Sequence, residues 1–230
     1  MKKIETFAEI IKVDFKNIEF LKTAFTHRSY LNEHRGEKIE HNERLEFLGD
    51  AVLELVVTHH LFHKFPEEKE GVLTAYRSAI VNTVSLMRVA EELNINDWLL
   101  LSKGEAKDEG RARTYIVANV IEAIIGAIYL DRGYDAAAIF IDTYFLKITD
   151  EVVEKSLWQD DKSHFQEKAQ EFERVTPKYE TLEESGPDHA KHFKVGVFLR
   201  NKLIADGDGV SKQEAEQEAA KNGLKAKQWS

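Results

Sequence analysis

The sequence predicts an all-α domain followed by a small α+β domain of αβββα order. In residues 1–155, apolar residues recur at helical spacing, as in Leu45, Leu48 and Val52, and only one of the three prolines occurs there. The remaining residues contain a run with apolar residues at alternate positions, which is typical of a strand with one buried face. A length of 230 residues is sufficient for two such domains.

Helical periodicity with few breakers predicts six helices in the first domain. The expected helices are Thr6–Ile11, Asn17–Phe25, Asn42–Phe65, Glu70–Leu93, Tyr115–Arg132 and Tyr134–Glu154. A change of composition then indicates a linker over residues 156–162. We therefore expect one helical domain over residues 1–155 and a second domain over residues 163–230.

The second domain is expected to begin with a helix that ends before Thr176-Pro177, because proline disfavours helix at the residue before it. That helix is expected at Ser163–Arg174, and strands are expected to follow it at Lys178–Ser185, Phe193–Leu199 and Lys202–Gly209. Arg200-Asn201-Lys202 is expected to form a hairpin connection. Ser211 and Glu214 have the spacing of a capping box, which predicts that a final helix opens there.

Composition excludes several classes of protein. There are no cysteines, which excludes disulfide frameworks, cysteine-ligated zinc, iron–sulfur clusters and thiol nucleophiles. The first residues lack a signal-peptide core and no apolar run looks long enough to span a bilayer, so we expect a cytoplasmic protein with no membrane partner. The net charge is −9, so binding to a nucleic acid would depend on local basic patches.

Acidic side chains are grouped at helical spacing in the third expected helix. Glu43, Glu46 and Asp50 stand at positions i, i+3 and i+7, so they share one face. Asn119 and Glu122 repeat the i, i+3 spacing inside an apolar stretch. Oxygen ligands of this kind suit Mg²⁺. The alternative is that these acids form only the solvated faces of two helices.

The residues that carry these acids resemble a known family. The motif Asn42–Asp50 (Asn-Glu-Arg-Leu-Glu-Phe-Leu-Gly-Asp) is similar to the signature of bacterial ribonuclease III, and the likeness extends through residues 24–30, 70–71, 101–105 and 122–131. The C-terminal part resembles a double-stranded-RNA-binding domain. The resemblance implies a homodimeric, all-helical endonuclease domain that hydrolyses double-stranded RNA with Mg²⁺, for which Mn²⁺ would substitute.

Carried over by position, the family's metal ligands fall on Glu46, Asp50, Asn119 and Glu122, and Asp50 and Glu122 are the expected catalytic residues. Glu43 and Glu70 match acids near the site or the dimer contact. Asn119 is a departure, because aspartate is commoner there. The implied chemistry is attack by metal-activated water, giving 5′-phosphate and 3′-hydroxyl ends.

The second domain offers side chains suited to the shape of duplex RNA, which is recognised through 2′-hydroxyls and phosphates. The expected RNA-binding residues are Gln166, Gln170, His189, Lys191, Lys212 and Lys221. The final helix would place its positive end and Lys212 toward a phosphate. Gln213 occupies a position that is often basic in the family, so we expect weaker and more salt-tolerant binding.

We therefore expect an endoribonuclease that processes rRNA, mRNA and other structured precursor RNA. One alternative is a dimeric protein that binds double-stranded RNA without cleaving it, and only Asn119 favours that alternative. A third is a helical scaffold with incidental acids. Incubation with a long RNA duplex, with and without Mg²⁺, distinguishes the three.

Overall fold

The chain forms two compact units, Met1–Trp158 and Gln159–Ser230. The computed structural model describes residues 3–34, 36, 39–107, 110–156, 158, 160–187 and 191–229. Within those ranges the first unit is helical and the second combines three strands with two helices, which confirms the predicted fold class. Each unit is considered by itself below.

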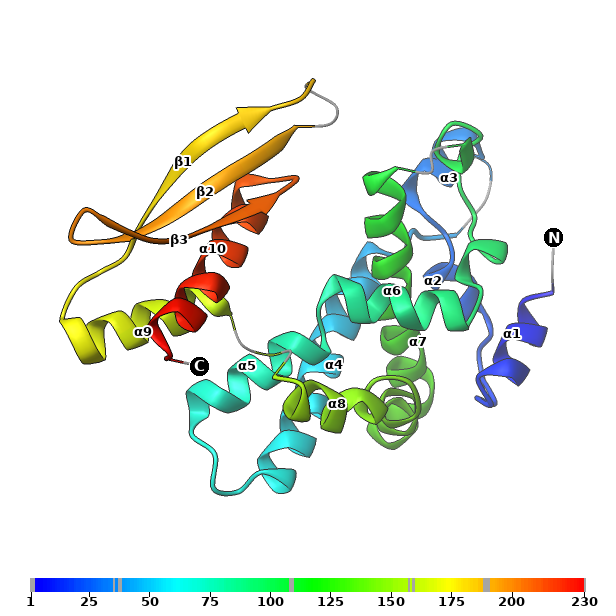
Figure 1. The fold of residues 1–230 in the computed structure, drawn as a ribbon. Coiled ribbons are helices and arrows are strands. Elements are labelled where there is room, and N and C mark those ends of the chain that lie inside the picture. The colour runs from blue at the N-terminus through cyan, green and yellow to red at the C-terminus, as the bar shows by residue number, and fades with distance from the viewer. Residues whose placement is uncertain are drawn as a thin grey trace. The chain divides into compact units, whose positions relative to one another are not determined.

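The first unit consists of eight described α-helices joined by short turns (Figure 1). They are α1 (Ile4–Ile10), α2 (Glu19–Ala24), α3 (Arg28–Glu33), α4 (Glu43–Lys64), α5 (Glu70–Ile80), α6 (Thr83–Glu92), α7 (Arg111–Tyr144) and α8 (Thr149–Glu154). Single 3₁₀ turns lie at Ile95–Asp97, Glu105–Lys107 and Leu146–Ile148.

Several elements differ from the sequence-based expectation. The helix expected over Tyr134–Glu154 ends at Tyr144 and is followed by a 3₁₀ turn and α8. The single helix expected over Glu70–Leu93 was wrong: the chain is extended at Asn82, whose side chain accepts the N–H of Ser85 and starts α6. Helix α3 was not expected at all. Helix α7 begins four residues before Tyr115, but its backbone leaves the helical conformation at Gly133 (φ 80°), where the expected division lies.

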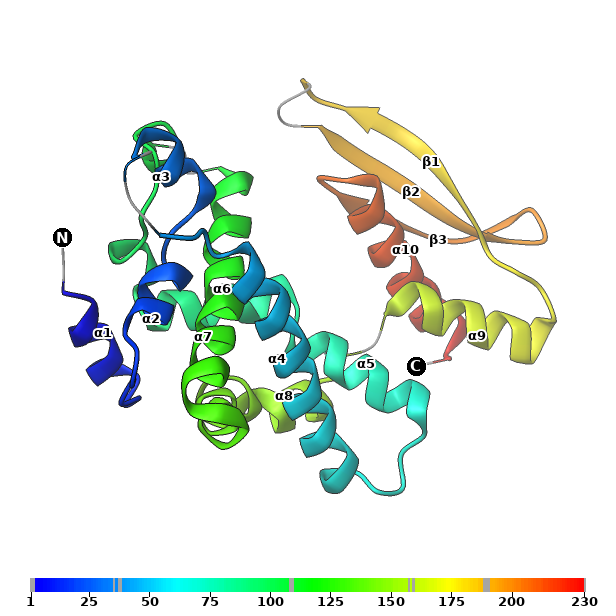
Figure 2. The same cartoon turned by 180° about the vertical axis from the view of Figure 1, so that it is seen from behind.

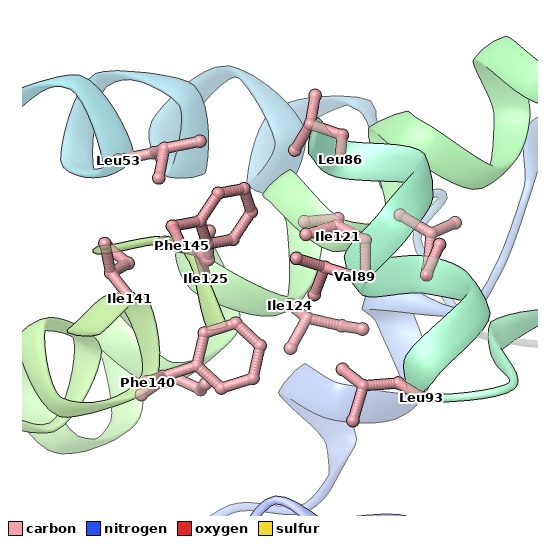
Figure 3. Close-up of a cluster of buried hydrophobic side chains, with 14 of the residues drawn as sticks. Leu53, Leu86, Val89, Leu93, Ile121, Ile124, Ile125, Phe140, Ile141 and Phe145 are labelled. Carbon is pink, nitrogen blue, oxygen red and sulfur yellow. The ribbon is translucent and has the colours of Figure 1, made fainter. Parts of the chain in front are cut away.

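Helix α7 lies at the centre of the first unit, and its most extensive partner is α4. Figures 1 and 2 show the two side by side from opposite directions. Figure 3 shows the buried cluster around α7, which includes Leu53, Leu86, Val89, Ile121, Ile124, Ile125 and Phe145. By length and composition alone, Ala112–Glu154 could cross a membrane, so the expectation that no apolar run is long enough to span a bilayer was wrong. In this fold, however, 56% of the most apolar window of that helix is buried.

Two glycines set the distance between α4 and α7. A Cβ at Gly49 would lie 1.7 Å from the carbonyl oxygen of Glu122, and a Cβ at Gly126 would lie 2.2 Å from that of Leu45. Real Cβ atoms do not approach backbone oxygens so closely, so any other residue would push the helices apart. The backbone contact brings the acidic turn of α4 next to the turn of α7 that carries Glu122.

The second unit packs two helices on one face of an antiparallel sheet (Figure 1). Its elements are α9 (Asp161–Glu173), β1 (Lys178–Ser185), β2 (His192–Leu199), β3 (Lys202–Gly209) and α10 (Lys212–Lys227), with strand order β1-β2-β3. β1 and β3 match the predicted bounds. Arg200 and Asn201 both have positive φ, which makes the predicted hairpin a two-residue turn of type I′ geometry.

Side-chain caps begin both helices of the second unit. The Asp160 carboxylate accepts the N–H groups of Lys162 and Ser163 at the start of α9. At the start of α10, the Ser211 hydroxyl accepts the N–H of Glu214 at 3.2 Å, as predicted. The Glu214 carboxylate reaches back to the N–H of Val210, one residue before the position that a standard capping box uses.

The helix crossing can be tested by replacing Gly126 with alanine. We expect Gly126→Ala to lower the free energy of unfolding by about 1–3 kcal/mol, because the methyl group forces α7 away from α4. Gly71→Ala is the matched control. Nothing lies within 4 Å of a Cβ there, so it should be neutral or stabilise α5 by up to ~1 kcal/mol. Urea unfolding measures both, and equal effects would contradict the role given to the crossing.

Candidate functional site

The predicted metal ligands meet where α4 crosses α7. Glu46 and Asp50 come from the first two turns of α4, and Asn119 and Glu122 come from the facing turns of α7. Asp50 is exposed, whereas the other three are half-buried. The Asn119 side chain lies near the Glu46 carboxylate, and hydrogen bonding from it opposes the rise in the pKa of Glu46.

The electrostatics of this cluster show that the carboxylates affect one another. Burial raises the pKa of Glu122 to about 7, with further contributions from the negative charges of Asp50 and Glu46. Burial also raises the pKa of Glu46; the Asn119 hydrogen bond opposes this shift, and the charges of Glu43 and Asp50 add to it. The cluster is therefore a partly desolvated group of like charges, which is unfavourable without a compensating cation.

The donor chemistry fits a hard divalent cation. Three carboxylates and one amide provide oxygen ligands, with no sulfur and no imidazole among them. Across the part of the chain that the structure describes, no three Asp, Glu or His side chains already stand in a geometry that could hold a metal ion. The four side chains are thus neighbours that would have to adjust around a cation.

Two further acids that the resemblance points to lie outside this cluster. Glu43 is exposed and lies 3.5 Å from the Arg28 guanidinium and 3.7 Å from Nδ1 of His41. Glu70 begins α5 and lines a hollow with Thr58 of α4, about two turns beyond Asp50. Within one copy of the chain, neither acid belongs to the cluster formed by Glu46, Asp50, Asn119 and Glu122.

The predicted RNA-contacting residues of the second unit fall into separate groups. Gln166 and Gln170 are exposed one turn apart on α9, where they line a shallow hollow. Lys212 is exposed at the first position of α10, with Nζ 5.6 Å from the centre of the Phe193 ring. Lys191 forms an ion pair of 2.7 Å with Glu184. This pairing lowers the pKa of Glu184, and the charge of Lys212 acts in the same direction.

The remaining two predicted RNA-contacting residues are Lys221 and His189. Lys221 is exposed on α10, 3.8 Å from Glu218, and its charge acts on Asp161 at the start of α9. It therefore lies toward the other end of α10 from Lys212. His189 lies outside the described residues. The structure thus places Lys191 and Lys212 near the same acid, Glu184, and the two glutamines on another helix.

Sequence reasoning missed the residues that hold the start of α4. Asn42 is buried, with its N–H donating to the carbonyl oxygen of Thr26 and its side-chain amide to that of Ala24. Thr26 in turn pairs with Leu100 as an isolated parallel bridge. Glycines inside two strongly helical patterns, at 49 and 126, were a readable signal for the crossing, but nothing local indicated the role of Asn42.

Comparison with known proteins identifies relatives of both units. A family model described as Ribonuclease-III-like matches residues 17–149, and one described as double-stranded RNA binding motif matches residues 162–227. The ribonuclease 3 of Carboxydothermus hydrogenoformans is 48% identical over 217 residues, covering 94% of this chain and 92% of its own. That of Bacillus velezensis is 47% identical, covering 97% and 90%.

A solved structure resembles the first unit. The nuclease domain of ribonuclease III from Campylobacter jejuni is 40% identical to this chain, with a TM-score of 0.56, and the match covers 63% of this chain and 99% of that one. A second structure of the same domain gives a TM-score of 0.55.

The raised pKa of Glu122 predicts a pH-dependent stability. Its folded-state value of about 7 exceeds the ordinary value near 4.3, so the stability that its protonated form provides is present at low pH and is lost as the pH rises through 7. Without divalent cations, Glu122→Gln should match the wild type near pH 4 and exceed its unfolding free energy by about 1–3 kcal/mol at pH 8. Urea unfolding across this pH range measures it, and a difference independent of pH would refute the desolvation of Glu122.

Proposed function

Because the chain belongs to the ribonuclease III family of double-stranded-RNA endoribonucleases, we propose that it cleaves duplex RNA at the α4–α7 crossing with a divalent cation. The observation that carries this proposal is the half-buried Glu122, held among the like charges of Asp50 and Glu46. Mg²⁺ is the cation proposed, and Mn²⁺ would substitute because it accepts the same oxygen ligands.

In this proposal Glu46, Asp50, Asn119 and Glu122 hold the cation, and Asp50 and Glu122 are the catalytic residues. A divalent cation there would supply an activated water and offset negative charge on the scissile phosphate. Asn119 would contribute an oxygen without charge, and its interaction with Glu46 favours the ionised form of that carboxylate. Attack of water on phosphorus with departure of the 3′ oxygen gives 5′-phosphate and 3′-hydroxyl ends, and no side-chain nucleophile is needed.

We propose that the helical units pair in a homodimer. Phe47 is 81% exposed and Leu130 is 50% exposed, and with Phe20 and Leu48 they line an open cavity of about 800 Å³. Large apolar side chains gathered on a surface favour burial against a partner. The related Campylobacter structure is described as containing a region involved in dimer formation, which supports the same assembly here.

The division of labour between the units is also part of the proposal. Residues 1–155 would catalyse and dimerise, residues 156–162 would link, and residues 163–230 would bind double-stranded RNA. The two compact units and the two family matches support this division. We propose rRNA, mRNA and other structured precursor transcripts as substrates, processed in the cytoplasm without a membrane partner.

The catalytic assignment is tested by Glu122→Gln and Asp50→Asn. Either change should lower cleavage of a long RNA duplex in Mg²⁺ by at least about a hundredfold, because it removes a charged ligand. The dissociation constant for the duplex should stay within about twofold, since the second unit is untouched. Glu54→Gln, an exposed acid on the same helix, is the control and should cleave normally. Normal turnover by either site variant would contradict the assignment of Asp50 and Glu122 as catalytic residues.

The role of Asn119 decides between cleavage and binding alone. Asn119→Asp should retain or raise the cleavage rate, because it adds a charged oxygen ligand. If the wild type binds the duplex without Mg²⁺-dependent cleavage and Asn119→Asp cleaves it, the wild-type chain would be a binding protein with a weakened site.

The RNA-binding assignment is tested by Lys212→Ala. Loss of one phosphate contact should weaken binding to every duplex, whatever its sequence, and flatten the plot of log affinity against log salt by somewhat less than ~1 unit. The cleavage rate at saturating RNA should change little. Lys225→Ala, an exposed lysine in the last turn of the same helix, should leave the slope unchanged. Equal slopes for the wild type and Lys212→Ala would remove Lys212 from the phosphate-binding face.

A further inference from the structure

His27 of the first unit is part of a chain of hydrogen bonds that neither the metal site nor the second unit uses. It is the N-cap residue of α3, where its Nδ1 accepts the N–H of Ser29 at 3.3 Å. The same Nδ1 lies 2.8 Å from the Ser29 hydroxyl oxygen. That oxygen accepts the N–H of Ser102 at 3.1 Å.

These contacts determine which ring nitrogen carries the proton. A nitrogen that accepts a backbone N–H has a free lone pair, so Nδ1 is unprotonated. The Ser29 hydroxyl, whose oxygen accepts from Ser102, is then free to donate its own hydrogen to Nδ1. A neutral imidazole with an unprotonated Nδ1 carries its proton on Nε2. The network therefore fixes His27 as a donor at Nε2.

The surroundings keep this ring neutral. Burial lowers the pKa of His27, and the charges of Arg28 and His41 act in the same direction, against the opposing effect of Glu105 and Glu43. Protonation would also put a hydrogen on Nδ1 and break its contact with the Ser29 N–H. Near neutral pH the side chain is thus an uncharged donor.

The backbone holds His27 beside the acidic turn of α4. Its N–H donates to the carbonyl oxygen of Leu100 at 3.0 Å, and the preceding residue, Thr26, accepts the N–H of Asn42 at 2.9 Å. Asn42 directly precedes Glu43 and the helix that carries Glu46. Among the described residues Nε2 has no hydrogen-bond partner, and it is not one of the atoms buried without one.

We propose that His27 is an RNA-binding residue of the helical unit, with Nε2–H donating to a backbone oxygen of the duplex next to the strand that is cut. This inference rests on the proposed function. A fixed neutral donor suits a surface that is already acidic: residues 1–159 carry 20 Lys and Arg against 27 Asp and Glu. A hydrogen bond of this kind holds the RNA backbone near the carboxylates without adding a cation that would pair with them.

The test separates the two nitrogens of the ring. His27→Asn keeps a side-chain acceptor suited to an N-cap, so α3 should remain intact. It removes the donor at Nε2. In steady-state cleavage of a long RNA duplex with Mg²⁺, we expect KM to rise about 5- to 30-fold and kcat to stay within about twofold. His34→Asn, the same substitution at the other end of α3, is the control and should leave both constants unchanged.

Two further measurements sharpen the result. ¹⁵N spectra of the histidine-labelled wild type should show protonated Nε2 and unprotonated Nδ1 for His27, and Ser29→Ala should weaken that preference. Replacing nucleotides near the cut by 2′-deoxy nucleotides should abolish the effect of His27→Asn if the acceptor is a 2′-hydroxyl and preserve it if the acceptor is a phosphate.

The outcomes distinguish this inference from the proposed function. An unchanged KM in His27→Asn, a fall in kcat alone, or a proton on Nδ1 would each overturn the role of His27 while leaving the endonuclease assignment in place. A wild-type chain that never cleaves would overturn the endonuclease assignment. The dissociation constant of His27→Asn for the same duplex would then still decide whether His27 binds RNA.

Discussion

The close crossing of α4 and α7 is the constraint on which the candidate site depends. Helix pairs usually lie 8–10 Å apart because side chains fill the contact. Here Gly49 and Gly126 leave the two backbones touching, so side chains on the flanking turns have to share a small volume. Those side chains are acidic, and the raised pKa of Glu122 is the electrostatic consequence. The buried apolar face of α7 stabilises the crossing against this repulsion.

The acidic cluster lowers folding stability but favours the binding of a cation. With Glu122 ionised, like charges lie close together in a partly desolvated place, which costs folding free energy. A cation would remove that cost and so would bind more tightly than at an exposed group of acids. Asn119 moderates both effects, because an amide adds no charge and its hydrogen bond to Glu46 partly offsets burial.

An acidic chain that binds a polyanion must do so locally. The net charge is −9, and several lysines of the second unit are already engaged by acids, as Lys191 is by Glu184. Neutral donors therefore have a large part in the proposed RNA contacts. Gln166 and Gln170 on α9 and His27 on the helical unit each bring hydrogen bonds without a charge that neighbouring carboxylates would neutralise. Recognition of duplex RNA by its shape is compatible with such contacts.

The sequence by itself determined the fold class, the helical periodicity of the first unit and the order of helices and strands along the second. Local patterns decide these features: alternation marked β2, and positions i, i+3 and i+7 placed Glu43, Glu46 and Asp50 on one face. The i, i+3 spacing of Asn119 and Glu122, together with the family resemblance, also indicated these two residues as partners of those acids. The break at Asn82 was missed because the apolar period continues across it, and one capping side chain decides it.

Tertiary structure alone decided which acids meet. Glu43 and Glu46 are equivalent by spacing, yet Glu43 turns to Arg28 and His41 while Glu46 meets Asn119. The tautomer of His27 likewise depends on Ser102, 75 residues away in the chain. Spacing along one helix specifies which side chains share a face. Which helix packs against that face depends on how closely the two backbones can approach, and here two glycines on different helices allow the close approach.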